Sequence, residues 1–214
     1  AISDKNFSSF EKICEVEITN NQTRINDAKV DPYGGIVFGT YNEDPDKAKR
    51  KPIANLYRLA PNLSLTHLLS NITVSNGIAF SENENIMYFA DTPTGRIQKF
   101  EYTKNFNKFY ELETNMTFKN VGEPDGATVD IDNNYWSARV RGKCIICVDT
   151  KDEKIIEKIS LPTNTPTCVT FGGASLNSLY ITSLRADPTT DDEGGNLHKI
   201  ETSTQGRAQL LTDI

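Results

Sequence analysis

The sequence has few of the residues and patterns on which several common functions depend. Its 23 Lys and Arg are outnumbered by 29 Asp and Glu, and no basic stripe is present. Because nucleic-acid binding needs clustered cations that face phosphates, we expect no nucleic-acid partner. Apolar runs also stay far below the roughly 20 residues that cross a bilayer, so we expect no membrane partner.

Histidine and serine-hydrolase motifs are equally scarce. Only two histidines occur, His67 and His198, and both fall in expected strands on the polar outer side. The chain has no Gly-x-Ser-x-Gly turn, on which many serine hydrolases hold their nucleophile. We therefore interpret both histidines as solvated strand residues and expect no serine triad.

Four cysteines are present, at positions 14, 144, 147 and 168. Cys144 and Cys147 have the C-x-x-C spacing, but they lie in an expected strand at 143–149. Residues three apart on a strand point to opposite faces, so these sulfurs cannot share a metal or close an unstrained disulfide. Unpaired thiols are typical of a reducing compartment and predict a cytoplasmic protein. Five Asn-x-Ser/Thr sequons point the other way, but several arise by chance in so asparagine-rich a chain.

Short apolar runs bounded by Gly, Asn, Asp and Pro occur throughout, and helical periodicity is hard to find. We therefore predict an all-β fold. Aligning the turns brings out a repeat in which a strand, a turn and a second strand recur. Its leading residues are Asn26, Asn76, Asp125 and Thr167, which are separated by 50, 49 and 42 positions.

Each repeat has room for further strands after the first two. We expect a third strand at 55–59, 96–100, 144–148 and 196–200, and a more polar fourth strand in most repeats, as at 109–112 and 154–158. Four strands in a unit of this length are the signature of a propeller blade. The first strand of each blade lies innermost, so the four leading residues should face one another around a channel.

The four leading residues, which we call the ring residues, carry oxygen atoms and include no His or Cys. Converging carboxylate and amide oxygens suit a hard cation such as calcium, magnesium or manganese. Ordinary turn residues of the Asx type are an alternative interpretation of equal weight from the repeat alone.

Four stretches of the chain resemble the SMP-30/gluconolactonase/regucalcin family of six-bladed propellers, which includes the luciferin-regenerating enzymes. These stretches are Arg-Ile-Asn-Asp at 24–27 running into Val-Asp-Pro-Tyr-Gly at 30–34, Ser-Asn-Gly at 75–77 with the strand to Asp91, Pro-Asp-Gly at 124–126 with Trp136, and Phe-Gly-Gly at 171–173 with Leu-Tyr-Ile-Thr at 179–182. Their order and spacing cover nearly the whole chain. The resemblance implies a hydrolase of sugar lactones or related esters with a divalent metal in the channel.

The resemblance also implies a metal site and a base. It makes Asn76 and Asp125 metal ligands and Asp125 the general base. The implied mechanism has the metal polarise the lactone carbonyl and activate a water, while Asp125 accepts the proton. Calcium is the metal we expect, with zinc, manganese and magnesium as alternatives.

Substrate contacts are implied at four further positions. Arg24 and Asn26 match substrate-binding residues of the family. An acid after the second strand of that blade completes the contacts, and the place falls on Asp44, with Glu43 beside it. The family more often has Glu at that position, and the shorter Asp bears on substrate choice.

One family motif has no counterpart here. Family members begin with a blade whose first strand follows a Gly-Glu-Gly-Pro-type motif and supplies a glutamate to the metal. Six blades at this period need roughly 290 residues, and this chain supplies about four and a half blades. We therefore predict a single propeller domain over residues 1–214 that lacks its N-terminal blade.

Two other functions stay open beside the metal-dependent lactonase. One is a catalytically silent propeller that binds calcium or a protein partner. The other is a related propeller hydrolase that acts on phosphotriesters or luciferin-type substrates, because one scaffold hosts several chemistries. Our leading prediction is a monomeric lactonase with a small-molecule substrate.

Overall fold

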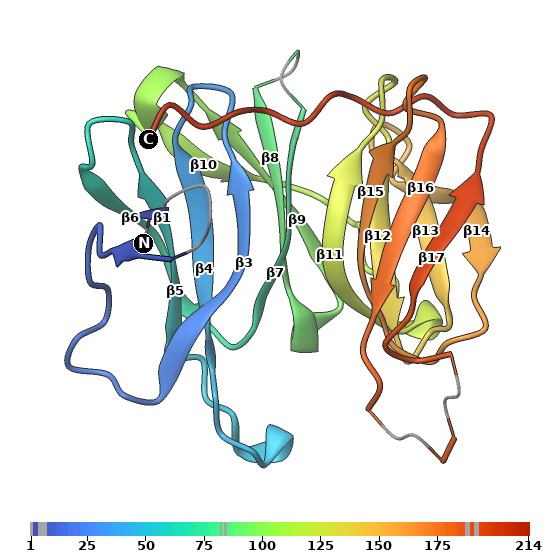
Figure 1. Cartoon of the computed structure of the whole chain (residues 1–214), viewed down its shortest axis with the longest axis horizontal. Coiled ribbons are helices and arrows are strands. Elements are labelled where there is room, and N and C mark those ends of the chain that lie inside the picture. Colours follow the sequence, from blue (N-terminus) through green and yellow to red (C-terminus); the bar gives the residue numbers. More distant parts are fainter. Residues whose placement is uncertain (1, 4–7, 82, 84, 187–188, 191–192) are drawn as a thin grey trace.

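The computed structural model describes residues 2–3, 8–81, 83, 85–186, 189–190 and 193–214. These residues form mainly β-strands (Figure 1). The short helical segments are 3₁₀ turns: η1 (Lys47–Lys49), η3 (Thr92–Thr94), η4 (Lys104–Phe106) and η5 (Lys119–Val121). No helix in the described part of the chain has the length and apolar character of a membrane span. The all-β prediction is confirmed.

The strands form successive antiparallel sheets, which we call blades 1 to 4 in chain order. Blade 1 holds β3 (Thr23–Val30), β4 (Ile36–Asn42), β5 (Ala54–Leu59) and β6 (Leu65–Ile72). Blade 2 holds β7 (Ser75–Ser81), β8 (Ile86–Asp91), β9 (Ile97–Tyr102) and β10 (Phe109–Leu112). Blade 3 holds β11 (Glu123–Val129), β12 (Tyr135–Val140), β13 (Cys144–Asp149) and β14 (Lys154–Ser160), and blade 4 holds β15 (Pro166–Gly172), β16 (Ser178–Ser183) and β17 (Leu197–Glu201). A short pair, β1 (Ile2–Ser3) and β2 (Phe10–Glu11), precedes them.

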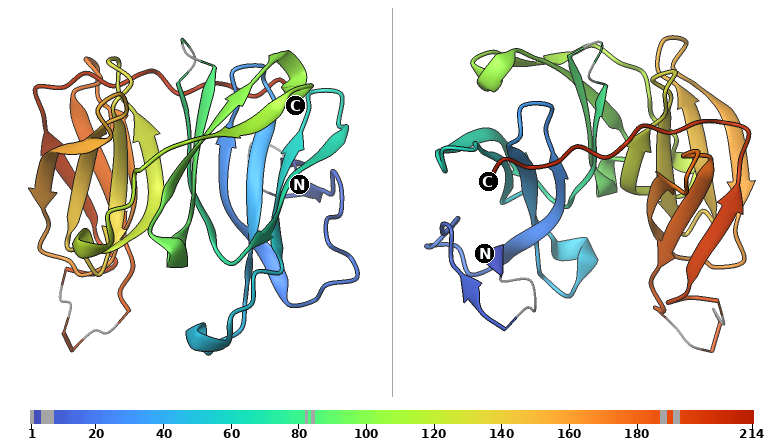
Figure 2. Two further views of the ribbon diagram at one scale, coloured as in Figure 1. Left: turned by 180° about the vertical axis from the view of Figure 1, so that it is seen from behind. Right: turned by 45° about the horizontal axis from the view of Figure 1, so that its top comes forward.

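Consecutive strands pair within each blade, so the first strand lies at one edge of its sheet. The first strands of neighbouring blades also contact one another, β3 with β7, β7 with β11 and β11 with β15. Figure 2 shows the blades arranged side by side around these inner strands. A propeller-like arrangement of four blades is therefore present. A total of six blades and an absent N-terminal blade remain predictions.

Apolar side chains fill the space between neighbouring blades. Leu56 of blade 1 packs in one buried cluster with Phe89 of blade 2. The next cluster joins blades 2 and 3 and contains Cys144, while the third joins blades 3 and 4 and contains Cys147. These two thiols lie on opposite faces of β13, as predicted, and all four cysteines are unpaired.

Buried aspartates fix the turn after the inner strand in two blades. Asp31 accepts hydrogen bonds from the amides of Tyr33 and Gly35, and its Oδ2 lies 2.6 Å from Nε of the buried Arg58. Asp130, at the equivalent position of blade 3, accepts a 2.9 Å hydrogen bond from the Trp136 indole nitrogen. These carboxylates satisfy the turn amides and tie the turn to the sheet.

The C-terminal residues 206–214 cross the end of the channel where the inner strands finish (Figure 1). Gly206 pairs with Asp130, and the Arg207 guanidinium donates to the carbonyls of Asp130 and Ile131. Farther along, the Asp213 amide donates to the Gly34 carbonyl at 2.9 Å. This segment, which we call the tail, joins blades 3 and 1, and the repeat did not predict it.

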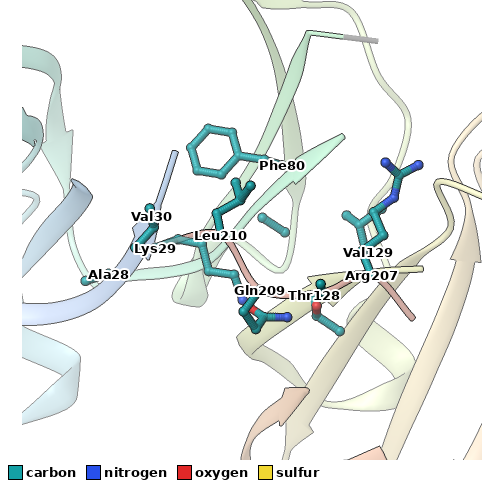
Figure 3. A pocket seen from close by; sticks show the side chains of 11 residues that line it. Ala28, Lys29, Val30, Phe80, Thr128, Val129, Arg207, Gln209 and Leu210 are labelled. Carbon is teal, nitrogen blue, oxygen red and sulfur yellow. The ribbon is translucent and has the colours of Figure 1, made fainter. Parts of the chain in front are cut away.

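The tail closes a cavity of about 330 Å³ at this end. Figure 3 shows Leu210 and Gln209 of the tail between the ends of three inner strands. Val30, Phe80 and Val129 supply most of the apolar wall from those strands. The tail therefore packs as a cover rather than as an additional strand of a blade.

Candidate active site

The inner strands share an irregular register near the points where they begin. The pairing shifts between Ile25 and Ala28, between Asn76 and Ala79, between Pro124 and Ala127, and between Pro166 and Cys168. Each shift contains or borders a ring residue. A β-bulge leaves a residue out of the ladder and redirects its side chain. The same type of irregularity therefore recurs at all four ring positions.

The ring residues line a single hollow of about 560 Å³. It lies at the end of the channel where the inner strands begin, opposite the tail. Its wall also includes Tyr41, Arg50, Thr92 and Glu123. The structure thus brings together the four ring positions of the repeat, while their roles remain predictions.

A chain of hydrogen bonds orients two of the ring amides. Asn26 Nδ2 donates to the Ser75 carbonyl at 2.8 Å and to Asn76 Oδ1 at 3.0 Å. Asn76 Nδ2 donates to Thr92 Oγ1 at 2.8 Å, and Thr92 donates to the Pro124 carbonyl at 2.9 Å. A carbonyl can only accept, so both ends of this chain fix the direction of every bond in it.

These directions determine which atoms the hollow can offer to a ligand. Asn26 uses both hydrogens of its amide within the protein, so the group that remains for a ligand is its oxygen. Asn76 Oδ1 accepts one hydrogen bond and has a second lone pair for another partner. Both amides are therefore set to present oxygen, which suits a cation or a hydroxyl donor.

Asp125 is half-buried on the bulge of β11. Burial raises the pKa of its carboxyl to about 7, and the negative charges of Asp27 and Glu123 add to the rise. A hydrogen bond from the Gly126 amide opposes it. A carboxyl that titrates near neutrality can act as a general base, and a bound cation would favour its ionised form.

The donor set fits a hard divalent cation. Asn76 Oδ1 and the Asp125 carboxylate are both oxygen donors on the wall of the same hollow. Within the described ranges, no group of three or more His, Cys, Asp or Glu converges as a metal site. Calcium takes six to eight oxygen ligands, so these two side chains would leave most positions for water, substrate or other groups.

Two of the predicted substrate-binding residues pair with each other. Arg24 Nε lies 2.7 Å from Glu43 Oε1, and both side chains are exposed. The Arg24 guanidinium also lies 4.6 Å from the centre of the Tyr41 ring, which lines the hollow. Arg24 and Glu43 do not line the hollow themselves, and both contact Tyr41, which does.

Asp44 lies elsewhere. It lines a second hollow, together with Asn42 and Arg50. The Asp44 amide donates to Asn42 Oδ1 at 2.9 Å, and the Asp44 carbonyl accepts from Arg50 Nε at 2.8 Å. The structure does not place Asp44 on the wall of the ring hollow, and Arg50 alone among these residues lines both.

The histidines lie away from the ring hollow. His67 on β6 is exposed and its Nε2 is 3.0 Å from Ser70 Oγ, in agreement with a solvated strand residue. His198 on β17 is half-buried, so it is less solvated than predicted.

Two residues that the sequence did not single out interact with the ring residues or with the backbone beside them. Thr92 follows the end of β8 and links two blades, and its signal was its place directly after a second strand. Asp27 follows Asn26, and burial raises the pKa of its carboxyl to about 6, against hydrogen bonds from backbone amides and the charge of Lys29. No spacing rule would have separated Asp27 from an ordinary turn residue.

The chain matches a known family over most of its length. Residues 1–185 match the model of the SMP-30/Gluconolactonase/LRE-like region. YvrE of Bacillus subtilis, provisionally named a sugar lactone lactonase, is 32% identical over 204 residues, which are 92% of this chain and 68% of that protein. Pentonolactonase XacC of Haloferax volcanii is 28% identical over 207 residues, 92% of this chain and 69% of that protein. 

A solved structure agrees with these relatives. The calcium-binding protein regucalcin of Agrobacterium tumefaciens superposes with a TM-score of 0.85 at 25% identity, over 98% of this chain and 71% of that one. Fold and sequence therefore point the same way. The chain belongs to the SMP-30/gluconolactonase/LRE-like family.

Proposed function

We propose that this chain is a lactonase-type hydrolase that acts on sugar lactones or related esters at a divalent metal in the ring hollow. The observation that carries the proposal is the hydrogen-bond chain from Asn26 through Asn76 to Thr92, which sets amide oxygens toward a hollow that Asp125 also lines. Relatives named as lactonases support the reaction class.

Asn76 and Asp125 would hold the metal. Because both offer oxygen, calcium is the first candidate, and the likeness to a calcium-binding regucalcin supports it. Magnesium and manganese share this ligand preference, whereas zinc more often takes nitrogen and sulfur ligands. When bound, the metal supplies Lewis acidity that polarises a carbonyl and lowers the pKa of a water.

The side chains in and beside the hollow transfer the proton and bind the substrate. Asp125 takes a proton from the attacking water, and it can return that proton to the ring oxygen as the lactone opens. Asn26 accepts a hydrogen bond from a substrate hydroxyl through its oxygen. Arg24, held beside the hollow by Glu43, donates to substrate oxygens through its planar guanidinium. In this scheme Asp44 acts through Arg50, which lines both hollows.

We propose that a further ligand completes the metal site from a blade outside these 214 residues. The chain spans about two thirds of the length of the relatives that it matches. Two protein oxygens are few for calcium, and a glutamate from another blade would add charge and a third donor. The metal affinity of the chain alone should then be lower than that of a complete propeller.

The test is an assay of aldonolactone hydrolysis with calcium, manganese, zinc or magnesium. Asp125→Ala should lower kcat/KM by about a thousandfold or more, because it removes both a ligand and the base. Asn76→Ala should weaken metal affinity as well as turnover. Asp132→Ala, an exposed turn residue of the same blade, is the matched control and should match the unmodified chain.

Two results would contradict this proposal. Unchanged turnover in Asp125→Ala would remove Asp125 as the base. Calcium binding by calorimetry without turnover of any lactone would instead favour a silent calcium-binding propeller.

A further inference from the structure

Asp27 reaches from blade 1 to the bulge of blade 2. Its Oδ2 accepts a hydrogen bond from the Ile78 amide at 3.0 Å. Ile78 lies within the register shift of β7, directly after Asn76 and Gly77. A bulged peptide group has lost its ladder partner, so its orientation depends on whatever contacts replace the ladder.

Tyr135 holds the same peptide group from the other side. This side chain is fully buried on β12 of blade 3, and its hydroxyl donates to the Gly77 carbonyl at 2.9 Å. The Gly77 carbonyl and the Ile78 amide belong to one peptide unit. Blade 1 therefore binds the N–H end of this unit and blade 3 binds its C=O end.

The backbone at this point accepts only glycine. Gly77 has φ +64°, and a Cβ there would lie 2.4 Å from the Tyr135 hydroxyl. The left-handed backbone conformation and the close approach of Tyr135 each exclude a side chain at position 77. Together they define one orientation of the peptide that follows Asn76.

We propose that Asp27 is a positioning residue that, opposite Tyr135, locks the Gly77–Ile78 peptide and so aims the Asn76 side chain into the hollow. The inference rests on the proposed function in that Asn76 is taken as a metal ligand. Loss of the Asp27 acceptor frees the peptide to rotate, and rotation of that plane moves the adjoining Asn76 backbone. A ligand oxygen needs to be held within roughly 0.5 Å, so a small rotation is enough to weaken the site.

Asp27 could act as a hydrogen-bond acceptor or through its negative charge, and two variants at this position separate the two roles. Asp27→Asn retains an oxygen that can accept from Ile78 but has no charge. Asp27→Ala has neither. A positioning role therefore predicts that Asn rescues and Ala does not, whereas a purely electrostatic role predicts equal loss in both.

The experiment combines calcium titration calorimetry with amide hydrogen exchange of Ile78 by NMR. Asp27→Ala should weaken calcium binding by about 10- to 100-fold, the usual effect of losing a group that orients a ligand, and should speed exchange at Ile78. Asp27→Asn should stay within about threefold of the unmodified chain in calcium affinity. Asp132→Ala serves as the control for both readouts.

Tyr135→Phe tests the lock from the opposite side and covers the case in which Asp27→Ala does not fold. It removes one hydroxyl and should also speed Ile78 exchange and weaken calcium binding. Equal loss in Asp27→Asn and Asp27→Ala would overturn the proposal, as would unchanged Ile78 exchange in Tyr135→Phe. If the unmodified chain binds no calcium, the proposed function fails, and the exchange rates alone then decide whether the peptide is locked.

Discussion

The inner strands begin at one end of the channel and finish at the other, and the two ends are built differently. Where they begin, bulges interrupt the pairing and expose Asn76 and Asp125 to a hollow of about 560 Å³. Where they finish, buried aspartates close the turns and the tail covers a smaller cavity of about 330 Å³. The same inner strands thus form the candidate site at one end, which we call the open end, and a closed, tail-covered structure at the other, which we call the anchored end.

The difference lies in how completely polar groups are satisfied. At the tail end, Asp31 has Arg58 and two turn amides as partners. At the ring end, Asn76 Oδ1 retains a lone pair, and Asp125 is protonated well above the usual pH range of a carboxyl. Polar groups without a partner cost stability, so we expect the tail end to contribute more to the stability of the fold than the ring end.

The largest expected effect is the loss of the buried ion pair at the tail end. Arg58 is 2% exposed and Asp31 is 0% exposed. Arg58→Ala leaves the Asp31 carboxylate buried without its cation, which should lower the free energy of unfolding by about 3–5 kcal/mol. Urea denaturation at pH 7 measures it.

Arg24→Ala is the matched control, because Arg24 makes an ion pair of similar length in solvent. Its side chain is 59% exposed, so the loss of stability should stay below about 1 kcal/mol. Equal losses in the two variants would contradict the distinction between an anchored end and an open end.

The repeat made the inner strands and the ring predictable. Strands begin within a few residues of Asn26, Asn76, Asp125 and Thr167, because alternating apolar runs and turn residues are local signals. Contacts across blades were not predictable in the same way. Asp27 meets Ile78 across 51 positions, and no repeat unit encodes that pairing.

The irregular segments of the chain could not be predicted from the sequence repeat. Asp44 follows a second strand, as the family pattern requires, but its loop folds back onto Asn42 and Arg50. The tail has no equivalent in the repeat, so its bonds to the turns of blades 3 and 1 depend on the assembled fold alone. Local patterns therefore predicted strands and faces, and they did not predict loops whose partners are distant.

A smaller effect is expected when the tail is loosened. The Arg207 guanidinium donates to two carbonyls of blade 3 and to Asn133 Oδ1 at 2.6 Å. Arg207→Ala should lower the free energy of unfolding by about 1.5–3 kcal/mol, the range for hydrogen bonds to a charged group. Calcium affinity should not change, because the ring hollow is at the other end.

Thermal denaturation and calcium titration of Arg207→Ala measure the two quantities separately. Arg185→Ala, which replaces an exposed arginine of the same chain, should change stability by less than about 0.5 kcal/mol. A parallel loss of calcium affinity in Arg207→Ala would show that the two ends are coupled rather than separate.

The smallest expected effect is a gain of stability at the ring end. Burial raises the pKa of Asp125 from 3.8 to about 7, so the folded chain binds this proton more tightly than the unfolded chain. The free energy of unfolding should therefore fall as pH rises from about 4 to about 7 and stay low above that range.

Without metal, Asp125→Asn should be more stable than the unmodified chain at pH 8 by about 1–2 kcal/mol, after allowance for solvent screening in the hollow, and equally stable at pH 4. Urea unfolding with a chelator at both pH values measures the difference. A gap that does not change with pH would contradict burial of the charge as its cause, and excess calcium should reverse the order by stabilising only the chain that retains the carboxylate.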